Sequence, residues 1–196
     1  IEHADDTMLH RMNRGMTQAM LREKITALRE AIPGIALRTS VIVGFPGETE
    51  ACFEHLLTFL GQIQFERLGA FQYSQEEGSA AMRFPDQVPV AIRQARFDRL
   101  MQLQETLASA WTARAIGRTT EVLIDEGGAE DPLQAVGRTS ADCPEVDGVI
   151  HVRSTRPLTP GEFVSVTITD SYGYDLIGTA IEPASPPTAY ASPQAG

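Results

Sequence analysis

The residues best suited to chemistry in this chain are its histidines, its cysteines and several carboxylates beside glycine-rich turns. The histidines show no i, i+4 pairing and no serine lies in a G-x-S-x-G turn, so a nucleophilic triad is not supported. The cysteines lack C-x-x-C or Cys/His ligand spacing, which argues against a local metal site and against a disulfide framework. These residues are His3, His10, His55, His151, Cys52 and Cys143.

A glycine-rich turn is the most informative feature of the sequence. Residues 35–50 read I-A-L-R-T-S-V-I-V-G-F-P-G-E-T-E, an alternating apolar strand followed by a turn and an acidic helix start. Gly44, Pro46 and Gly47 give the backbone room for a ligand, and ligands of α/β folds bind at the carboxyl ends of strands. An ordinary tight turn is the alternative. The turn lacks the Lys-Ser/Thr of a phosphate-binding loop, so nucleotide hydrolysis is not expected.

Two pairs of carboxylates flank the possible site. We expect Glu48 and Glu50 to fall in the first turn of a helix, where they favour the positive end of the helix dipole. Glu76 and Glu77 lie in a long loop after a strand, where a solvated position is the default and contact with a substrate is the alternative. None of the four is expected to be a catalytic residue.

Composition limits the class of protein. The 196 residues, 42% of them hydrophobic, are enough to build a sizeable core. No apolar run is long enough to span a bilayer and no signal peptide is visible, so we expect a cytoplasmic protein without membrane contact. The net charge is −10, with Lys24 the only lysine, unlike a general nucleic-acid binder. Because the chain begins at Ile1 and a helix follows almost at once, we expect it to be part of a longer protein.

The first half alternates helices and strands, which predicts a parallel sheet with crossover helices. Met20, Leu21, Ile25, Leu28 and Ile32 recur at helical spacing and are expected to pack in the core. The expected helices run from Asp5 or Asp6 to Met12, from Thr17 to Ile32, from Thr49 to Gly61 and from Pro89 to Ile116; the expected strands are 35–43 and 67–73, with a loop over 74–88.

The second half changes to short alternating strands separated by glycine and proline. Five such strands predict a small antiparallel barrel of the OB type. A tail rich in proline, alanine and serine over 183–196 is expected to be disordered. The five strands fall in the runs 120–125, 134–139, 149–153, 163–169 and 174–181.

Several runs together resemble the radical S-adenosylmethionine methylthiotransferases. They are L-R-T-S-V-I-V-G-F-P-G-E-T-E (37–50), F-E-R-L-G-A-F-Q-Y-S-Q-E-E-G-S-A-A (65–81), P-D-Q-V-P (85–89), G-R-T-S-A-D-C-P-E-V-D-G-V-I-H-V (137–152) and Y-D-L-I-G (174–178). The last three look like the RimO-type branch, which methylthiolates the β-carbon of an aspartate in ribosomal protein S-twelve. They look less like the MiaB-type branch, which acts on tRNA.

The resemblance implies an α/β plus all-β fold with four parts. Residues 1–89 would be the carboxyl-terminal portion of a radical-SAM partial (β/α) barrel, and 90–117 a connecting long helix. Residues 118–182 would be a TRAM domain, a five-stranded antiparallel OB-like barrel, followed by the tail. The full-length enzyme would use S-adenosylmethionine and two 4Fe-4S clusters. The protein itself would bind and position these cofactors.

The resemblance also implies which residues face the cofactor. The C-x-x-x-C-x-x-C triad that ligates the radical cluster is absent from this sequence, so we carry over neither a metal ligand nor a catalytic residue. We expect the chain alone to bind no cofactor stably and to be inactive. The residues expected on the S-adenosylmethionine side are Val43, Gly44, Phe45, Pro46, Gly47, Glu48, Glu2 and Ser74.

The charge of the terminal barrel bears on its partner. Residues 118–182 contain four arginines against twelve carboxylates, a net charge of −8, whereas a tRNA-binding barrel needs a basic groove and stacking aromatics. An acidic surface suits a basic ribosomal protein, so we expect S-twelve rather than nucleic acid as the partner. The alternatives are a solvated surface kept for solubility, a tRNA-directed relative, or a binding module without catalysis. The sequence does not determine the oligomeric state.

Overall fold

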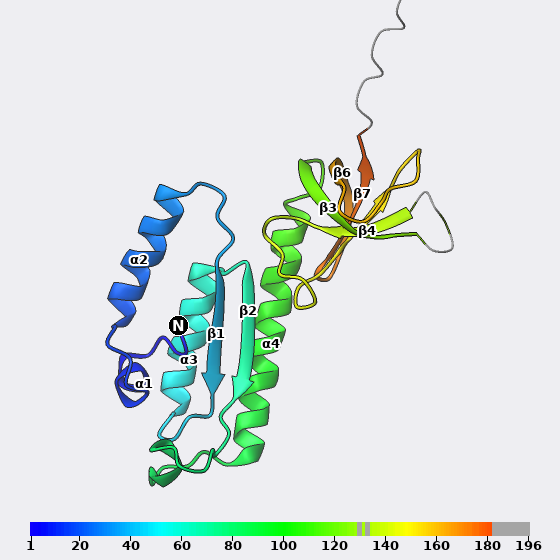
Figure 1. Ribbon diagram of the computed structural model, residues 1–196. Helices are drawn as coiled ribbons and strands as arrows, with labels where there is room; N and C mark the ends of the chain where they lie inside the picture. The colour runs from blue at the N-terminus through cyan, green and yellow to red at the C-terminus, as the bar shows by residue number, and fades with distance from the viewer. Residues whose placement is uncertain (129–130, 132–133, 182–196) are drawn as a thin grey trace, which may run out of the picture. The chain divides into compact units, whose positions relative to one another are not determined.

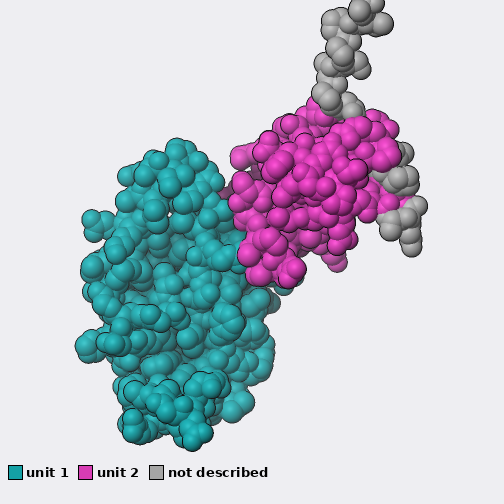
Figure 2. All heavy atoms as spheres, viewed as in Figure 1, with its two compact units in different colours: residues 1–111 teal, residues 112–196 magenta. Residues whose placement is uncertain are grey.

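The computed structural model describes residues 1–128, 131 and 134–181. They form two compact units, one of residues 1–111 and one that begins at Thr112, which Figure 2 shows in different colours. Each unit has its own apolar core. No helix in the described ranges is long and apolar enough to cross a membrane. The tail that the sequence predicts to be disordered, 183–196, lies outside the described residues.

The first unit is built on a parallel strand pair (Figure 1). The register runs from Arg38 opposite Arg67 to Val43 opposite Gln72, which confirms the predicted parallel sheet. Glu2 adds an isolated parallel bridge to Val41 on the other side of the first strand. The elements of this unit are α1 (Asp6–Arg11), α2 (Gln18–Ala31), β1 (Arg38–Val43), α3 (Glu50–Ile63), β2 (Arg67–Gln72), a 3-10 helix (Ala81–Arg83) and α4 (Val90–Ala113).

Side-chain caps fix the starts of the first three helices. Asp5 accepts hydrogen bonds from the N–H groups of Thr7 and Met8 and begins α1. Thr17 begins α2, and Thr49 begins α3 by accepting from the N–H of Cys52. Such caps satisfy backbone donors that the first turn of a helix leaves without partners. The predicted helix starts are therefore confirmed.

The predicted apolar stripe of α2 is only partly buried. Leu21 and Ile25 enter the core, whereas Met20, Leu28 and Ile32 are 42%, 43% and 51% exposed. The elements that pack against α2 cover only part of its apolar stripe. The prediction that all five residues pack in the core is therefore wrong. Among the helices of the first unit, α3 contributes most to the buried core. Its buried residues are Cys52, Phe53, Leu56, Phe59, Leu60 and Ile63.

In the first unit, three element boundaries differ by two residues or more from those predicted. β1 begins at Arg38 rather than at residue 35, because its partner β2 begins at Arg67, opposite Arg38. α3 continues past Gly61 to Ile63, which is buried, and Gln64 ends it with a left-handed φ of 54°. α4 ends at Ala113, three residues before the predicted end.

The second unit is a closed five-stranded barrel with the order β3-β4-β5-β7-β6. Alternate residues of each strand fill its interior, among them Val122, Ile124, Val152 and Val166. This confirms the predicted small OB-like barrel. Its strands are β3 (Thr119–Gly127), β4 (Gln134–Arg138), β5 (Ile150–Arg153), β6 (Phe163–Tyr172) and β7 (Asp175–Ala180).

One strand pair corrects the expectation of an entirely antiparallel barrel. β5 and β7 run parallel, with Ile150 opposite Leu176 and Arg153 opposite Thr179, while the other four pairs are antiparallel. A closed ring of five strands cannot alternate direction at every step, because five is odd. At least one parallel pair is therefore required, and the barrel is mixed.

Two glycines of the first unit give a test of local backbone energetics. A Cβ added at Gly61 meets nothing within 4 Å, and the residue lies inside α3. We predict that Gly61→Ala raises the free energy of unfolding by about 0.5 to 1 kcal/mol, because alanine favours the helix. Urea denaturation followed by circular dichroism measures this. Gly34 is equally open but has φ +82°, so Gly34→Ala should lower stability; a gain at both positions would contradict the account.

Candidate functional site

The turn between β1 and α3 occupies the carboxyl end of the parallel strands. Gly44 and Gly47 both adopt left-handed backbone conformations, with φ of 74° and 84°. The N–H of Glu48 donates to the carbonyl of Phe45 at 2.9 Å, which closes the turn. The N–H of Gly47 donates to the carbonyl of Asp86 at 2.7 Å, which attaches the turn to the loop before α4.

Arginine side chains of the same chain occupy the space that the two glycines leave open. A Cβ at Gly44 would lie 2.1 Å from Cγ of Arg93, and a Cβ at Gly47 would lie 2.6 Å from Cζ of Arg11. The sequence suggests that these glycines allow a ligand to approach closely. In the structure they allow the close approach of protein side chains.

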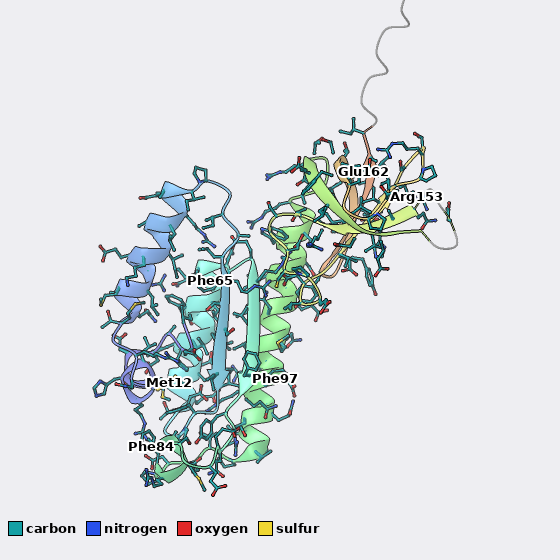
Figure 3. The ribbon with its side chains drawn as sticks, in the orientation of Figure 1. Met12, Phe65, Phe84, Phe97, Arg153 and Glu162 are labelled. Atoms are coloured by element: carbon teal, nitrogen blue, oxygen red, sulfur yellow. The ribbon has the colours of Figure 1, made fainter. Side chains whose placement is uncertain are left out.

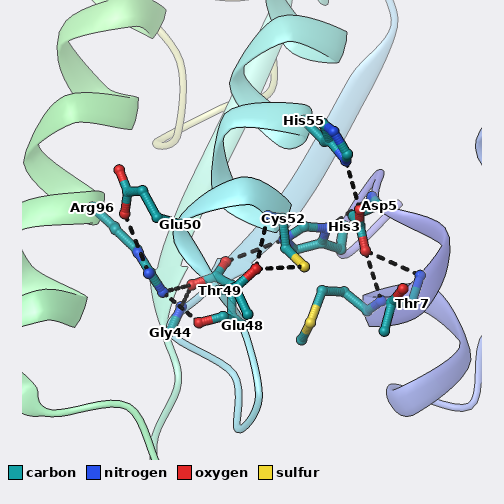
Figure 4. A network of polar contacts seen from close by, with 11 residues as sticks. His3, Asp5, Thr7, Gly44, Glu48, Thr49, Glu50, Cys52, His55 and Arg96 are labelled. Atoms are coloured by element: carbon teal, nitrogen blue, oxygen red, sulfur yellow. Dashed lines mark hydrogen bonds and ion pairs between the residues drawn. The ribbon is translucent and has the colours of Figure 1, made fainter.

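Glu48 is the centre of a buried polar network (Figure 4). Its fully buried carboxylate accepts from the N–H of Gly44 at 2.6 Å and from Nη1 of Arg96 at 2.7 Å. The other carboxylate oxygen lies 3.1 Å from Nε2 of His3. Glu48 precedes the cap residue Thr49, so it lies outside the helix, and the prediction that it occupies the first turn of α3 is wrong.

His3 links this network to α1. Its Nδ1 accepts a hydrogen bond from the N–H of Asp5 at 3.0 Å. A neutral imidazole carries one proton, so that proton is on Nε2 and is donated to Glu48. His3 itself is fully buried. The imidazole therefore connects the segment after Glu2 to the turn that follows β1.

Arginines at a spacing of three along α4 hold the other side of the turn. Arg93 donates to the carbonyls of Tyr73 at 2.5 Å and Val88 at 3.0 Å. Arg96 also binds the carbonyl of Glu48 at 2.9 Å and the carboxylate of Glu50 at 3.3 Å. Residues three apart lie on one face of a helix. That face fixes the glycine turn, the end of β2 and the start of α3.

The Glu50 carboxylate is shared by two of these arginines. Arg99 donates to it at 2.6 Å and also pairs with Glu54. The hydrogen bond from Arg99, followed by that from Arg96, holds the pKa of Glu50 below its usual value. Because Glu50 is largely exposed, solvent weakens this effect.

An aromatic cluster lies beside the turn. Phe45 contacts Tyr73 edge-on at a centroid distance of 5.2 Å and Phe84 at 6.1 Å. Met8 and Cys52 complete the buried part of the cluster, with Met12 and Phe84 packed against it; Figure 3 labels the last two. The Tyr73 hydroxyl is buried without a hydrogen-bond partner among the described groups. Buried hydroxyls usually have one, so this hydroxyl is available to a ligand.

Of the residues predicted to face a cofactor, those from Val43 to Glu48 lie together around the turn, whereas Glu2 and Ser74 lie apart from it. Val43, Phe45 and Pro46 are buried with Gly44 and Glu48 around the turn, and Gly47 is half-buried at its edge. Ser74 is exposed one residue after Tyr73. Glu2 lies beside the middle of β1, with φ of 65°, and pairs with Arg14 at 3.0 Å.

Sequence reasoning missed the donors that hold the turn. Arg93 and Arg96 were not singled out, although Arg93, Arg96 and Arg99 at a spacing of three are a detectable signal, and His3 was named without its partner Glu48. A hollow of about 360 Å³ opens beside the turn. Its lining includes Arg11, Gly47, Thr49, Asp86, Ile92 and Arg96.

Across residues 1–128, 131 and 134–181, no group of three or more histidine, cysteine or acidic side chains is placed to hold a metal ion. Cys52, in the first unit, accepts a hydrogen bond from the Thr49 hydroxyl at 3.2 Å. Cys143, in the second unit, is exposed. A cluster that needs three thiolates has no set of ligands in this part of the protein.

Comparison with known proteins identifies relatives for both units. Residues 116–181 match the TRAM domain family. Over 181 residues, or 92% of its length, the chain is 44% identical to the ribosomal protein uS12 methylthiotransferase RimO of Anaeromyxobacter sp. (strain K). It is 46% identical to the RimO protein of Desulfitobacterium hafniense (strain Y51) over 182 residues. The chain spans only 38% and 40% of the length of these two relatives.

The buried carboxylate should control the stability of the first unit. We predict that Glu48→Gln lowers the free energy of unfolding by about 3 to 5 kcal/mol, because it leaves the buried charge of Arg96 with only its longer contact to the exposed carboxylate of Glu50. Urea denaturation measures the loss. Glu54→Gln is the matched control: Glu54 is 50% exposed and pairs with Arg99, so its loss should stay within about 1 kcal/mol. Equal losses would contradict the central position of Glu48.

The Asp5 cap should make the free energy of unfolding depend on pH in the acid range. Burial alone would raise the pKa of Asp5, but hydrogen bonds from His55, the Met8 N–H and Cys52 outweigh it and lower the pKa. Its contribution is therefore complete above about pH 4, the ordinary value, and is lost as pH falls through the lowered pKa. The stability difference between wild type and Asp5→Asn, measured by urea denaturation, should shrink below pH 4. A difference that grows there would contradict this.

Proposed function

The chain is homologous to the TRAM-containing carboxyl-terminal part of the RimO methylthiotransferases, and from this premise we propose that it is part of an enzyme that methylthiolates an aspartate of ribosomal protein uS12. The observation that carries the proposal is identity above 40% across both units rather than across the TRAM domain alone. A ribosomal protein as substrate places the reaction in the cytoplasm.

The proposed division of labour follows the two units. Residues 1–89 supply part of the cofactor-binding barrel, 90–117 connect the parts, and 118–182 form the substrate-binding domain. The separate cores of the two units and the match at 116–181 support this division. We assign the S-adenosylmethionine side of the site to the turn Val43–Glu48, together with Glu2 and Ser74.

The carboxyl ends of β1 and β2 offer S-adenosylmethionine both a polar and an apolar contact. The Tyr73 hydroxyl is buried without a partner, and the exposed Ser74 follows it. A bound molecule with polar and apolar parts would satisfy the hydroxyl and lie against the Phe45 cluster. When bound, this cofactor supplies the methyl-transfer and radical chemistry. An iron–sulfur cluster does not fit the described residues, so no step through one is assigned to this chain.

In this proposal, the first unit contributes by holding the ends of β1 and β2 in position. Glu48 holds Gly44 through its backbone N–H, and Arg93 fixes the carbonyl of Tyr73, the residue after β2, so both strand ends keep one geometry. A site must be held within a fraction of an ångström for efficient reaction. His3 and Arg96 act through Glu48 and are positioning residues. Alone, the chain is proposed to lack catalytic activity.

The contribution of the second unit is recognition of a basic protein. Between Arg118 and Glu182 the sequence has four arginines against twelve carboxylates. Two of these arginines are already paired within the barrel, Arg138 with Asp125 and Arg156 with Glu162. Few cations therefore remain to neutralise phosphates, whereas the acidic surface complements a basic ribosomal protein.

Binding by the full chain tests the substrate class. We predict that fluorescence anisotropy will show binding to a basic loop peptide of uS12 that weakens as salt is raised, because screening reduces attraction between surface charges. A tRNA anticodon stem-loop should bind weakly under the same conditions. Tighter binding of the RNA than of the peptide would favour a tRNA-directed enzyme and overturn the uS12 assignment.

A further inference from the structure

A small hollow lies on the barrel where β3, β4 and β6 meet. Its volume is about 260 Å³. Strand register explains its position: Leu123 of β3 lies opposite Phe163 of β6 on one side and opposite Arg138 of β4 on the other. An aromatic ring, an aliphatic side chain and a guanidinium group thus form one row across three strands.

The aromatic side chain of this row is exposed to solvent. Phe163 is 63% exposed although it lies in a strand, and its neighbour Val164 is buried in the barrel interior. The ring lines the hollow, so a group that enters the hollow meets it. Hydroxyl groups of Thr120, Thr139 and Ser140 complete a partly polar lining.

The charges around the hollow favour a cation. The positive charge of Arg138 is offset by its ion pair with Asp125. Asp142 accepts hydrogen bonds from the backbone and hydroxyl of Thr139 at 3.0 and 2.6 Å. Glu121 lines the hollow and is exposed, and its carboxylate has no hydrogen bond or ion pair with any described residue. Its carboxylate is therefore available to a partner.

We propose that this hollow receives a lysine or arginine side chain of the protein that the barrel binds. The cationic group stacks on the face of Phe163 and pairs with Glu121, while its alkyl portion contacts Leu123. Cations within about 6 Å of an aromatic ring are attracted to its face. The proposal rests on the proposed function, because it gives the acidic barrel a specific contact point on its basic substrate.

A nucleic acid fits the same hollow less well. A base could stack on Phe163, but the adjoining phosphates would meet Glu121 and Asp142, and the one arginine in the lining is already paired. Binding to nucleic acid draws its affinity mainly from neutralised phosphates. The hollow therefore fits a basic peptide better than a strand of RNA.

The test compares two exposed aromatics at opposite ends of β6. Phe163→Ala and Glu121→Gln remove the ring and the charge of the hollow, and Tyr172→Ala is the matched control, since Tyr172 is 83% exposed. Isothermal titration calorimetry of the full chain with purified uS12 gives the affinities. We expect each hollow variant to weaken binding at least about tenfold and the control to stay within about twofold. Thermal unfolding checks that all variants fold.

The possible outcomes distinguish a failure of this inference from a failure of the proposed function on which it rests. If uS12 binds the wild type and all three variants alike, the hollow is not the contact point although the substrate assignment stands. If uS12 does not bind the wild type but a tRNA stem-loop does, both proposals fail. If Tyr172→Ala weakens binding more than Phe163→Ala, the contact lies at the other end of β6 and the inference is wrong.

Discussion

The buried carboxylate of Glu48 is the interaction on which the first unit depends. It receives hydrogen bonds from the backbone of Gly44, from Arg96 and from His3, three segments far apart in sequence. A buried charge is tolerated only when its partners are complete. The fold must therefore bring the start of the chain, the end of β1 and the start of α4 to one place. The glycine turn is the visible result.

The same constraint gives the glycines their function. Because Arg93 and Arg11 pass over Gly44 and Gly47, the turn is packed by the protein's own cations rather than left open. The hollow that remains lies beside the turn, and Arg11, Thr49 and Asp86 are among the residues that line it. A rigid turn next to a partly unsatisfied aromatic cluster is a suitable place for a cofactor. In the proposed function, the acidic barrel, a separate unit, supplies the recognition of the substrate.

Local signals in the sequence predicted much of this architecture. Caps at Asp5, Thr17 and Thr49 and the strand alternation were sufficient to predict the helices, the parallel pair and the small barrel. The environment of Glu48 was not predictable, because His3 and Arg96, two of its three partners, lie more than 40 residues away and hydrogen-bond partners over that distance leave no periodic pattern. The exposure of Ile32 and the parallel β5–β7 pair likewise depend on tertiary neighbours and ring closure.

The most direct test of the central claim is the modification state of uS12 in cells. Peptide mass spectrometry of uS12 would compare the source organism with a strain in which the gene encoding this chain is deleted. The account predicts a methylthio group on one aspartate of uS12 in the parent strain and its loss in the deletion strain. An unchanged aspartate, with loss of a methylthio group from tRNA instead, would contradict it.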